Sequence, residues 1–234
     1  MSDPIYPTDR SLLSNPARLR AYLRVICNRN KACLPYHEAK EALFKLVQCK
    51  SLYGDNVVIT DIHTPNINVE HIVPQSFFNK REPMRGDLHH LYPANDKLNE
   101  WRSNYMFGEL AGESDECEHT ADRFEPQNFS KGNIARAIAY FVTTYDMVDL
   151  KRVICPDTLV LWNIIDPVDD DERHRNTEIC KIQGNINPYI VHPELCTYAF
   201  MDYIKGDVKG TIDGVDYHFK REDLLPPRTP APIT

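Results

Sequence analysis

The sequence predicts an α+β fold, a helix-rich single domain with a small β element near its middle. Segments 14–26, 36–50 and 131–145 carry apolar residues at the spacing of helices that bury one face. Two shorter runs, 56–62 and 68–74, instead have the length and the β-branched composition of strands. The chain has 234 residues, 42% apolar and 26% charged, which is enough for a core and ordinary for a globular protein.

The first helix has clear boundary signals. Ser14 or Asn15 can cap its first turn, and Pro16 suits the first helical position because its missing N–H is not needed there. Leu19 and Leu23 fall on one face together with Ile26, so we expect this face to pack inward.

Composition indicates the remaining elements. Further helices are expected at 155–166 and 167–183, and the second opens with an acidic cluster that suits the positive end of a helix dipole. Polar or proline-rich stretches predict loops at 111–130 and 184–195. We therefore expect one domain over 1–225 and a disordered tail, "PPRTPAPIT", at 226–234.

Ligand-capable residues gather in the middle of the chain. Strands at 68–74 and 87–94, followed by a helix at 95–104, would form a ββα arrangement that brings the first strand close to the helix. Glu70 and His71 interrupt the apolar first strand, where burying them is costly unless both are paired or bound. Because neighbouring residues of a regular strand face opposite sides, we expect irregular backbone at 70–72.

Several ordered blocks of sequence carry a resemblance to a known family. These blocks are "EHIVPQSF", "GDLHHLYPAND", "LNEWRSNYMFGE", "FSKGNIARAIAYFVTTY", "WNIIDPVDDDERHRN" and "IQGNINPYIVHPEL". Together they resemble the endonuclease I family of non-specific nucleases over roughly residues 15–200. The resemblance implies a ββα-metal (His-Me finger) core at about 67–105.

The resemblance also implies roles for three residues. His71 matches the general base that activates water, Glu70 a metal-ligating carboxylate, and Asn99 a helix asparagine that holds the same metal. The implied cofactor is one Mg²⁺, for which Ca²⁺ or Mn²⁺ may substitute in chemistry that uses hard oxygen ligands. The implied function is a metal-dependent, largely sequence-non-specific endonuclease on DNA, with RNA as a further substrate, that leaves 5′-phosphate ends.

Four further residues are candidates for the substrate phosphate. Family members use an arginine from the loop between the strands, for which Arg81 and Arg85 are candidates here, together with Lys80. Either of the adjacent histidines, of which we favour His90, could contact phosphate or simply support the strand. Arg102 could bind phosphate bidentately or pair with an internal acid such as Glu109.

The charge distribution leaves the nucleic-acid interface open. The net charge of −7 disfavours nucleic acid, but residues 1–50 hold nine Lys/Arg against four Asp/Glu. We therefore take Arg18, Arg20 and Arg24 as a candidate DNA-binding surface. The alternatives are a non-catalytic nucleic-acid-binding protein and a zinc module built on His71, His89 and His90.

Cellular context is only weakly indicated. The seven cysteines are scattered without a CxxC pair, which is typical of reduced thiols. No apolar stretch is long enough for a membrane span, and the first residues lack the pattern of a secretory signal. We expect a monomer without membrane association, inside the cell, although many family members are periplasmic or secreted.

Overall fold

The protein has an α+β fold, as predicted, in a computed structural model that describes residues 5–46, 49–110 and 116–227. The described helices are α1 (Pro16–Asn28), α2 (Tyr36–Lys45), α3 (Asp96–Arg102), α4 (Asn128–Tyr145), α5 (Pro156–Ile165), α6 (Asp170–Gln183), α7 (Pro188–Val191) and α8 (Glu194–Phe200). The described strands are β1 (Ile67–His71), β2 (Leu91–Asn95), β3 (Met106–Phe107), β4 (Glu118–His119), β5 (Arg123–Glu125), β6 (Val208–Ile212) and β7 (Val215–Phe219). The strands form three small sheets, β1–β2, β3–β5–β4 and β6–β7.

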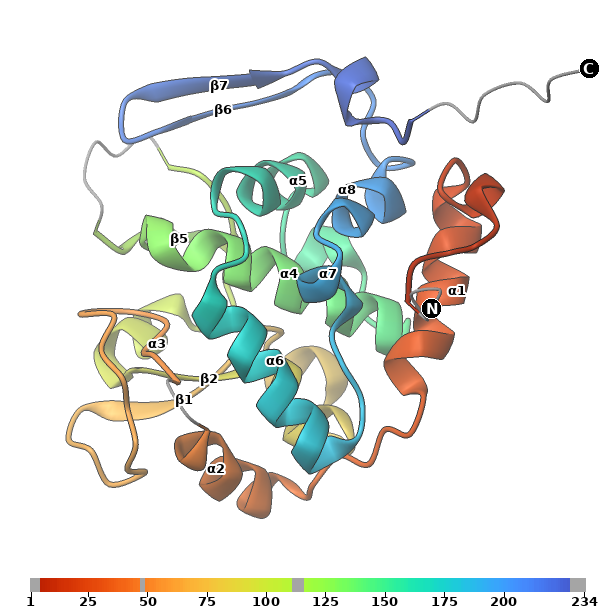
Figure 1. Cartoon of the computed structure of the whole chain (residues 1–234). Helices are drawn as coiled ribbons and strands as arrows, with labels where there is room; N and C mark the ends of the chain where they lie inside the picture. The colour runs from red at the N-terminus through yellow and green to blue at the C-terminus, as the bar shows by residue number, and fades with distance from the viewer. Residues whose placement is uncertain (1–4, 47–48, 111–115, 228–234) are drawn as a thin grey trace, which may run out of the picture.

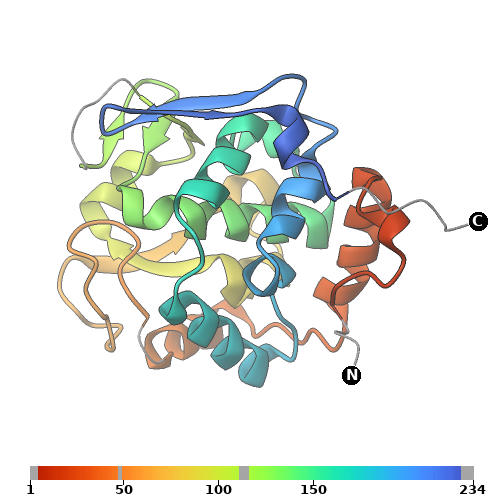
Figure 2. The ribbon, with the colours of Figure 1, turned by 45° about the horizontal axis from the view of Figure 1, so that its top comes forward.

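Helix α4 runs through the middle of the molecule, between the β1–β2 element and the later helices (Figures 1 and 2). Its apolar residues are buried along nearly its whole length, and they join one large hydrophobic cluster with side chains from α1, α5 and α8. A smaller cluster joins α2 to the outer face of β1 and β2. Burial of these faces, rather than local propensity, holds the helices in place.

Helix α1 begins as predicted. The Asn15 side chain accepts a hydrogen bond from the Arg18 backbone N–H at 3.1 Å, and Pro16 occupies the first turn. The inward face is made of Leu19, Leu23, Ile26 and Cys27. The capping choice left open between Ser14 and Asn15 is therefore settled in favour of Asn15.

The predicted order of two strands and a helix is present, with shifted boundaries. Strands β1 and β2 pair antiparallel, from Ile67 opposite Asn95 to His71 opposite Leu91, and α3 follows at once. The second strand begins at Leu91 rather than at residue 87, because the Asp87 carboxylate accepts from the His89 N–H and caps a 3₁₀ turn. The side-chain oxygen of Asn95 caps α3 by accepting from the backbone N–H groups of Lys97 and Leu98.

One strand prediction for this region is wrong. Residues 56–62 form only an isolated bridge at Val58; Val57 and Val58 are about half exposed, whereas Ile59 is buried. Irregular backbone was expected at 70–72, and β1 does end within this segment, at His71, with a bend at Ile72 and Val73 but no bulge before it. The pairing continues through His71, and the Ile72 N–H still donates to the His90 carbonyl at 3.0 Å.

Other segments are more ordered than their composition indicated. The described part of 111–130 holds β4, β5 and the start of α4, and 184–195 holds α7 and the start of α8. Helix α2 ends at Lys45, short of the predicted residue 50. The hairpin β6–β7 was not predicted, although Asp213-Gly214, with φ of +50° and +71°, is a strong two-residue hairpin signal. The predicted tail falls mostly on 228–234, outside the described residues.

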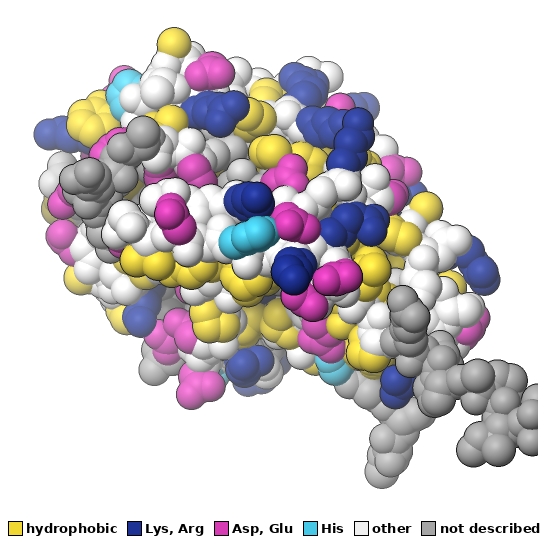
Figure 3. Space-filling model, turned by 90° about the horizontal axis from the view of Figure 1, so that it is seen from above, with side chains coloured by type: hydrophobic (Ala, Val, Ile, Leu, Met, Phe, Trp, Pro, Cys, Tyr) yellow, Lys and Arg dark blue, Asp and Glu magenta, His cyan; other side chains and the backbone are white. Residues whose placement is uncertain are grey.

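The surface over β6–β7 carries interspersed basic and acidic side chains (Figure 3). Within the described ranges, no helix is both long enough and apolar enough to cross a membrane. The seven cysteines are all free thiols.

Candidate active site

A cavity of about 370 Å³ opens where strand β1 ends. It is lined by Val69, Glu70, His71, Pro74, Gln75, Ser76, Asn99, Arg102, Ser103 and Asn104. The three residues with the sharpest predicted roles, Glu70, His71 and Asn99, therefore line the same cavity, with two on β1 and one on α3.

Strand alternation explains how adjacent residues reach one cavity without a bulge. Glu70 shares its face of β1 with Asn68, on the side of α3, whereas His71 shares the opposite face with Val69, on the side of α2. Because the strand ends at His71, the cavity extends around its end and is lined from both faces.

Glu70 is a buried carboxylate with two neutralising contacts. Only 3% of the residue is exposed, and its Oε1 accepts from the Tyr53 hydroxyl at 3.1 Å. The Arg102 guanidinium lies 3.4 Å from the same oxygen. Burial raises the pKa of Glu70 above its ordinary value, although Arg102 and Tyr53 act in the opposite direction. A further positive charge beside Glu70 would favour its ionised form.

His71 is held in one tautomer by a backbone carbonyl. Its Nε2 lies 3.1 Å from the carbonyl oxygen of Arg85, which can only accept, so Nε2 carries the proton. The Nδ1 atom is then a lone-pair acceptor, and it makes no hydrogen bond to any described residue. Burial, aided by His90, lowers the pKa of His71 to about 2, so the imidazole is neutral.

Asn99 presents a carbonyl oxygen that no described residue contacts. Its Nδ2 donates to the Val69 carbonyl at 3.3 Å and to the Asn68 Oδ1 at 2.6 Å. A backbone carbonyl cannot donate, so these contacts fix which end of the amide is nitrogen. The amide nitrogen is thereby tied to β1, and Oδ1 remains available as an oxygen ligand.

Arg102 supports this cavity from inside the protein. It is 1% exposed, and its guanidinium donates to the carbonyls of His71 and Ile72 as well as approaching Glu70. The expected internal pairing is therefore present, but with Glu70 instead of Glu109. Sequence reasoning missed Tyr53, which lies 17 residues before Glu70, because nothing local marks it as a partner of the site.

With this geometry established, similarity to known proteins identifies the family. A family model described as "Endonuclease I" matches residues 36–194, which is more than half of the chain. The chain belongs to the endonuclease I family. The resemblance predicted from the sequence blocks is thereby confirmed.

Named relatives of this family member include nucleases with different stated substrates. The chain is 33% identical over 166 residues to "Extracellular ribonuclease" of Bacillus subtilis (strain 168), covering 62% of this chain and 55% of the relative. It is 33% identical over 117 residues to "Extracellular deoxyribonuclease" of Aeromonas hydrophila, covering 46% and 50%. It is 34% identical over 113 residues to "Endonuclease-1" of Buchnera aphidicola subsp. Baizongia pistaciae (strain Bp), covering 44% and 45%. The chain spans about half the length of the curated relatives it matches.

Of the three basic residues in the loop between β1 and β2, Lys80, Arg81 and Arg85, the one whose side chain is hydrogen-bonded to a residue of the cavity is Arg85. Its Nε donates to Gln75 Oε1 at 2.9 Å, and its guanidinium lies 4.3 Å from the centre of the Tyr36 ring. Arg81 is exposed and donates to the Phe78 carbonyl at 3.2 Å, whereas Lys80 is exposed and lines no part of the cavity. Gln75 itself lines the cavity, so Arg85 is the best-placed candidate.

His90 does not face the cavity. It is fully buried, and its Nε2 donates to the Met84 carbonyl at 2.6 Å. Its ring packs edge-on against His71 and at a tilt against Phe141. Direct contact with phosphate is incompatible with this burial. Of the two roles considered for His90, contact with phosphate and support of the strand, the structure favours support of the strand.

Helix α1, which carries the candidate arginines, lies on the opposite side of the molecule from α3 and β1 (Figure 1). Arg20 forms a bidentate pair with Asp202 at 2.7 Å, and Arg24 pairs with Asp146 at 2.7 Å. Arg18 is exposed. Two of the three charges are thus partly neutralised within the protein, which weakens the case for a DNA-binding surface on α1.

The zinc alternative does not fit the geometry. The Nε2 atoms of His71, His89 and His90 each face a different backbone carbonyl, those of Arg85, Asn185 and Met84. Over residues 5–46, 49–110 and 116–227, no three His, Cys, Asp or Glu side chains are grouped so as to hold a metal ion. That finding does not bear on Glu70 and Asn99, the oxygen ligands implied by the resemblance, because a glutamate and an asparagine do not make a group of three such side chains.

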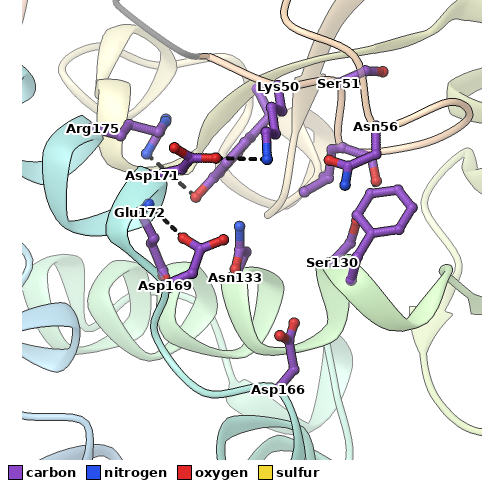
Figure 4. A pocket seen from close by; sticks show the side chains of 13 residues that line it. Lys50, Ser51, Asn56, Ser130, Asn133, Asp166, Asp169, Asp171, Glu172 and Arg175 are labelled. Carbon is purple, nitrogen blue, oxygen red and sulfur yellow. Dashed lines mark hydrogen bonds and ion pairs between the residues drawn. The ribbon is translucent and has the colours of Figure 1, made fainter.

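A second polar cavity, of about 120 Å³, lies between α4 and α6 (Figure 4). Its charged side chains are engaged in ion pairs and in hydrogen bonds to neutral groups. Lys50 contacts Asp171 at 2.6 Å, and Arg175 donates to the Tyr92 hydroxyl at 3.3 Å. The Asp169 carboxylate caps α6 through the Glu172 N–H at 2.7 Å. This cavity therefore serves to dock α6, and we assign no ligand to it.

Proposed function

We propose that this protein is a metal-dependent endonuclease that hydrolyses phosphodiester bonds, with His71 as the general base. One observation carries the proposal. A neutral imidazole with a free Nδ1, a buried carboxylate and an uncontacted amide oxygen line the same cavity in a chain of the endonuclease I family. These are the groups needed to activate water beside a cation-bound phosphate.

Glu70 and Asn99 are the residues that would hold the metal ion. The donor set fits a hard cation, because Glu70 supplies a carboxylate and Asn99 an amide oxygen without another partner among the described residues. A raised pKa caused by burial also makes Glu70 a group that a cation would stabilise. When bound, Mg²⁺, or Ca²⁺ or Mn²⁺ in its place, supplies charge stabilisation at the phosphate and at the leaving oxygen.

His71 would take the proton from the attacking water through Nδ1. The Arg85 carbonyl keeps the other ring nitrogen protonated, so the imidazole needs no rotation before it accepts. Water oxygen attacks phosphorus, and the bond from phosphorus to the 3′ oxygen breaks, which leaves a 5′-phosphate. The buried imidazole is neutral and ready to accept, and the negative phosphate would raise its low pKa during the reaction.

DNA is the proposed substrate, with RNA as a further one. The named relatives include both an extracellular ribonuclease and extracellular deoxyribonucleases, so the family resemblance does not separate the two sugars. Contacts to backbone phosphates would make binding weaker as salt concentration rises. Arg85 is the proposed phosphate-contacting arginine.

Cleavage of plasmid DNA and of an RNA of matched length, with Mg²⁺ and with EDTA, tests the proposal. We expect the wild type to cleave with Mg²⁺, and we expect His71→Ala to lose at least about 100-fold in rate, as for other general bases. Asn99→Ala should also lose rate, because it removes one of the two proposed metal ligands. His218→Ala is the matched control, because His218 is an exposed histidine paired with Asp207. Cleavage by His71→Ala at the wild-type rate would refute the mechanism. Binding without cleavage by the wild type would favour the non-catalytic alternative.

A further inference from the structure

A separate cavity of about 370 Å³ lies between helix α2 and the His71 face of strand β1. It is lined by Tyr36, Lys40, Phe44, Ile62, Ile67, Asn68 and Val69. Its volume falls in the range of small-molecule sites, roughly 300–1,000 Å³. Neither the family match nor the roles of Glu70, His71 and Asn99 account for it.

Three contacts join this cavity to the candidate active site. Val69 lines both cavities. Asn68 lines the α2 cavity and accepts a hydrogen bond from Asn99, which lines the other. The Tyr36 ring packs against the His71 ring with 5.1 Å between centroids. A substrate whose phosphate lies beside His71 would therefore place a neighbouring group within reach of Tyr36.

The walls of the α2 cavity combine aromatic and aliphatic side chains with the polar groups of Tyr36, Lys40 and Asn68. Tyr36, Phe44 and the aliphatic side chains of β1 form an aromatic and aliphatic surface. Lys40 is half-buried, with its ammonium 5.4 Å from the centre of the Tyr36 ring. Among the described residues, no carboxylate lines the cavity. Aromatic and aliphatic side chains beside an ammonium group and an amide suit a flat heterocycle that carries hydrogen-bonding groups and is attached to a phosphate.

We propose that the α2 cavity binds the base of a nucleotide next to the scissile phosphate, with Lys40 near that nucleotide's own phosphate. This proposal rests on the proposed nuclease function. Continuity with the candidate active site favours this occupant over an unrelated apolar ligand, and the lone ammonium complements a polyanion. Because a base inside a cavity cannot remain stacked in a duplex, the site prefers single-stranded or locally unpaired nucleic acid.

The test uses single-stranded oligonucleotides that carry one abasic residue at successive positions around a mapped cleavage site. With the wild type and Mg²⁺, we expect one flanking abasic position to lower kcat/KM by about tenfold, the scale of one base–aromatic contact. Tyr36→Ala should lower kcat/KM by a similar factor on the intact oligonucleotide, with no further loss at that abasic position. Tyr36→Phe, which keeps the aromatic ring, should retain the sensitivity to that abasic position.

The comparison of substrates separates binding of a base from support of His71. If Tyr36 only positions His71, Tyr36→Ala slows cleavage equally on intact and abasic oligonucleotides, and the proposal is overturned. The proposal also fails if the wild type cleaves every abasic oligonucleotide at the intact rate. Thermal unfolding of each variant shows whether its loss arises from instability. If the wild type cleaves plasmid DNA but no single-stranded oligonucleotide, this subsite is refuted while the nuclease function stands; cleavage of none of these substrates refutes both.

Lys40 has a matched control on the same helix. Lys45 is exposed, contacts Glu41 at 3.9 Å and does not line the cavity. With His71→Ala as the binding protein, Lys40→Ala should reduce the slope of log affinity against log salt by about 0.7, the value for one phosphate contact on a single strand. Lys45→Ala should leave the slope unchanged. Equal slopes for the Lys40 and Lys45 variants would remove Lys40 from the site.

Discussion

Arg102 offers the sharpest test of how the candidate active site is stabilised. Its guanidinium lies 3.4 Å from Glu70 and also donates to the carbonyls of His71, Ile72 and Ser103, with 1% of the residue exposed. Arg102→Met retains much of the side-chain volume and removes the charge and all donors. Glu70 then keeps the Tyr53 hydroxyl and the His71 backbone N–H as neutral partners in a buried site, with no positive charge from Arg102.

The expected loss in the free energy of unfolding is roughly 3–5 kcal/mol, the cost of leaving one member of a buried ion pair alone. Adding Glu70→Gln removes the stranded charge, so the double variant should be more stable than the sum of the two single changes predicts, by about 1–3 kcal/mol. Urea unfolding followed by circular dichroism measures each corner of this cycle. Additive effects within about 0.5 kcal/mol would show that the pair does not contribute.

The pH dependence of the same variant has a definite sign. Arg102 lowers the pKa of Glu70, so its removal raises that pKa further above the unfolded value. A raised carboxyl pKa costs stability as pH rises, because the folded state then holds a proton that the unfolded chain releases. The deficit of Arg102→Met should therefore be smaller at pH 4 than at pH 8. A deficit independent of pH would contradict the assignment of Arg102 as the partner of Glu70.

Three further predictions concern the scaffold. Burial raises the pKa of Asp166 to about 6 from 3.8, so the stability of the protein falls as pH rises from about 4 to about 6. Asp166→Asn should remove this pH dependence, which amounts to at most roughly 3 kcal/mol in the free energy of unfolding, as measured by urea titration at both pH values. Asp87→Asn should cost about 2–4 kcal/mol in urea unfolding at pH 7, because the buried carboxylate accepts from Tyr145 at 2.6 Å and Gln183 at 2.8 Å; a change below about 0.5 kcal/mol would contradict this. Gly132→Ala should lower the melting temperature by several degrees, because a Cβ there would lie 2.0 Å from the Asp166 carbonyl oxygen, and an unchanged melting temperature would be unexpected.

The sequence predicted best those elements whose local signals agree with their burial. Helix α1 has a side-chain cap, a proline in its first turn and an apolar stripe, and all three are present in the structure. The run at 56–62 has equally good strand composition, but it has no pairing partner beyond one bridge, and its valines stay exposed. Strand propensity describes fit to a half-buried sheet, so it fails where the chain provides no sheet.

The contacts around the candidate site were harder to predict than its residues. Glu70, His71 and Asn99 stood out because they are polar residues in recognisable blocks of sequence. Their partners Tyr53 and Arg85 act through long-range packing and through a backbone carbonyl, which no side-chain pattern reveals. Burial also lowers the pKa of His71 to about 2, which depends on packing that the local sequence does not show.

Strand alternation gives Glu70 and His71 different surroundings although they are neighbours. On one face of β1, Glu70 meets Tyr53 and Arg102, and on the other, His71 meets Tyr36 and the carbonyl of Arg85. Burial then shifts both pKa values toward the neutral forms, upward for the carboxyl and downward for the imidazole. A divalent cation at Glu70 would oppose the first shift, and a phosphate at His71 would oppose the second. The cation would therefore favour the carboxylate that binds it, and the phosphate would favour the imidazolium that forms when neutral His71 accepts a proton; strand alternation is sufficient to keep the two effects on separate residues.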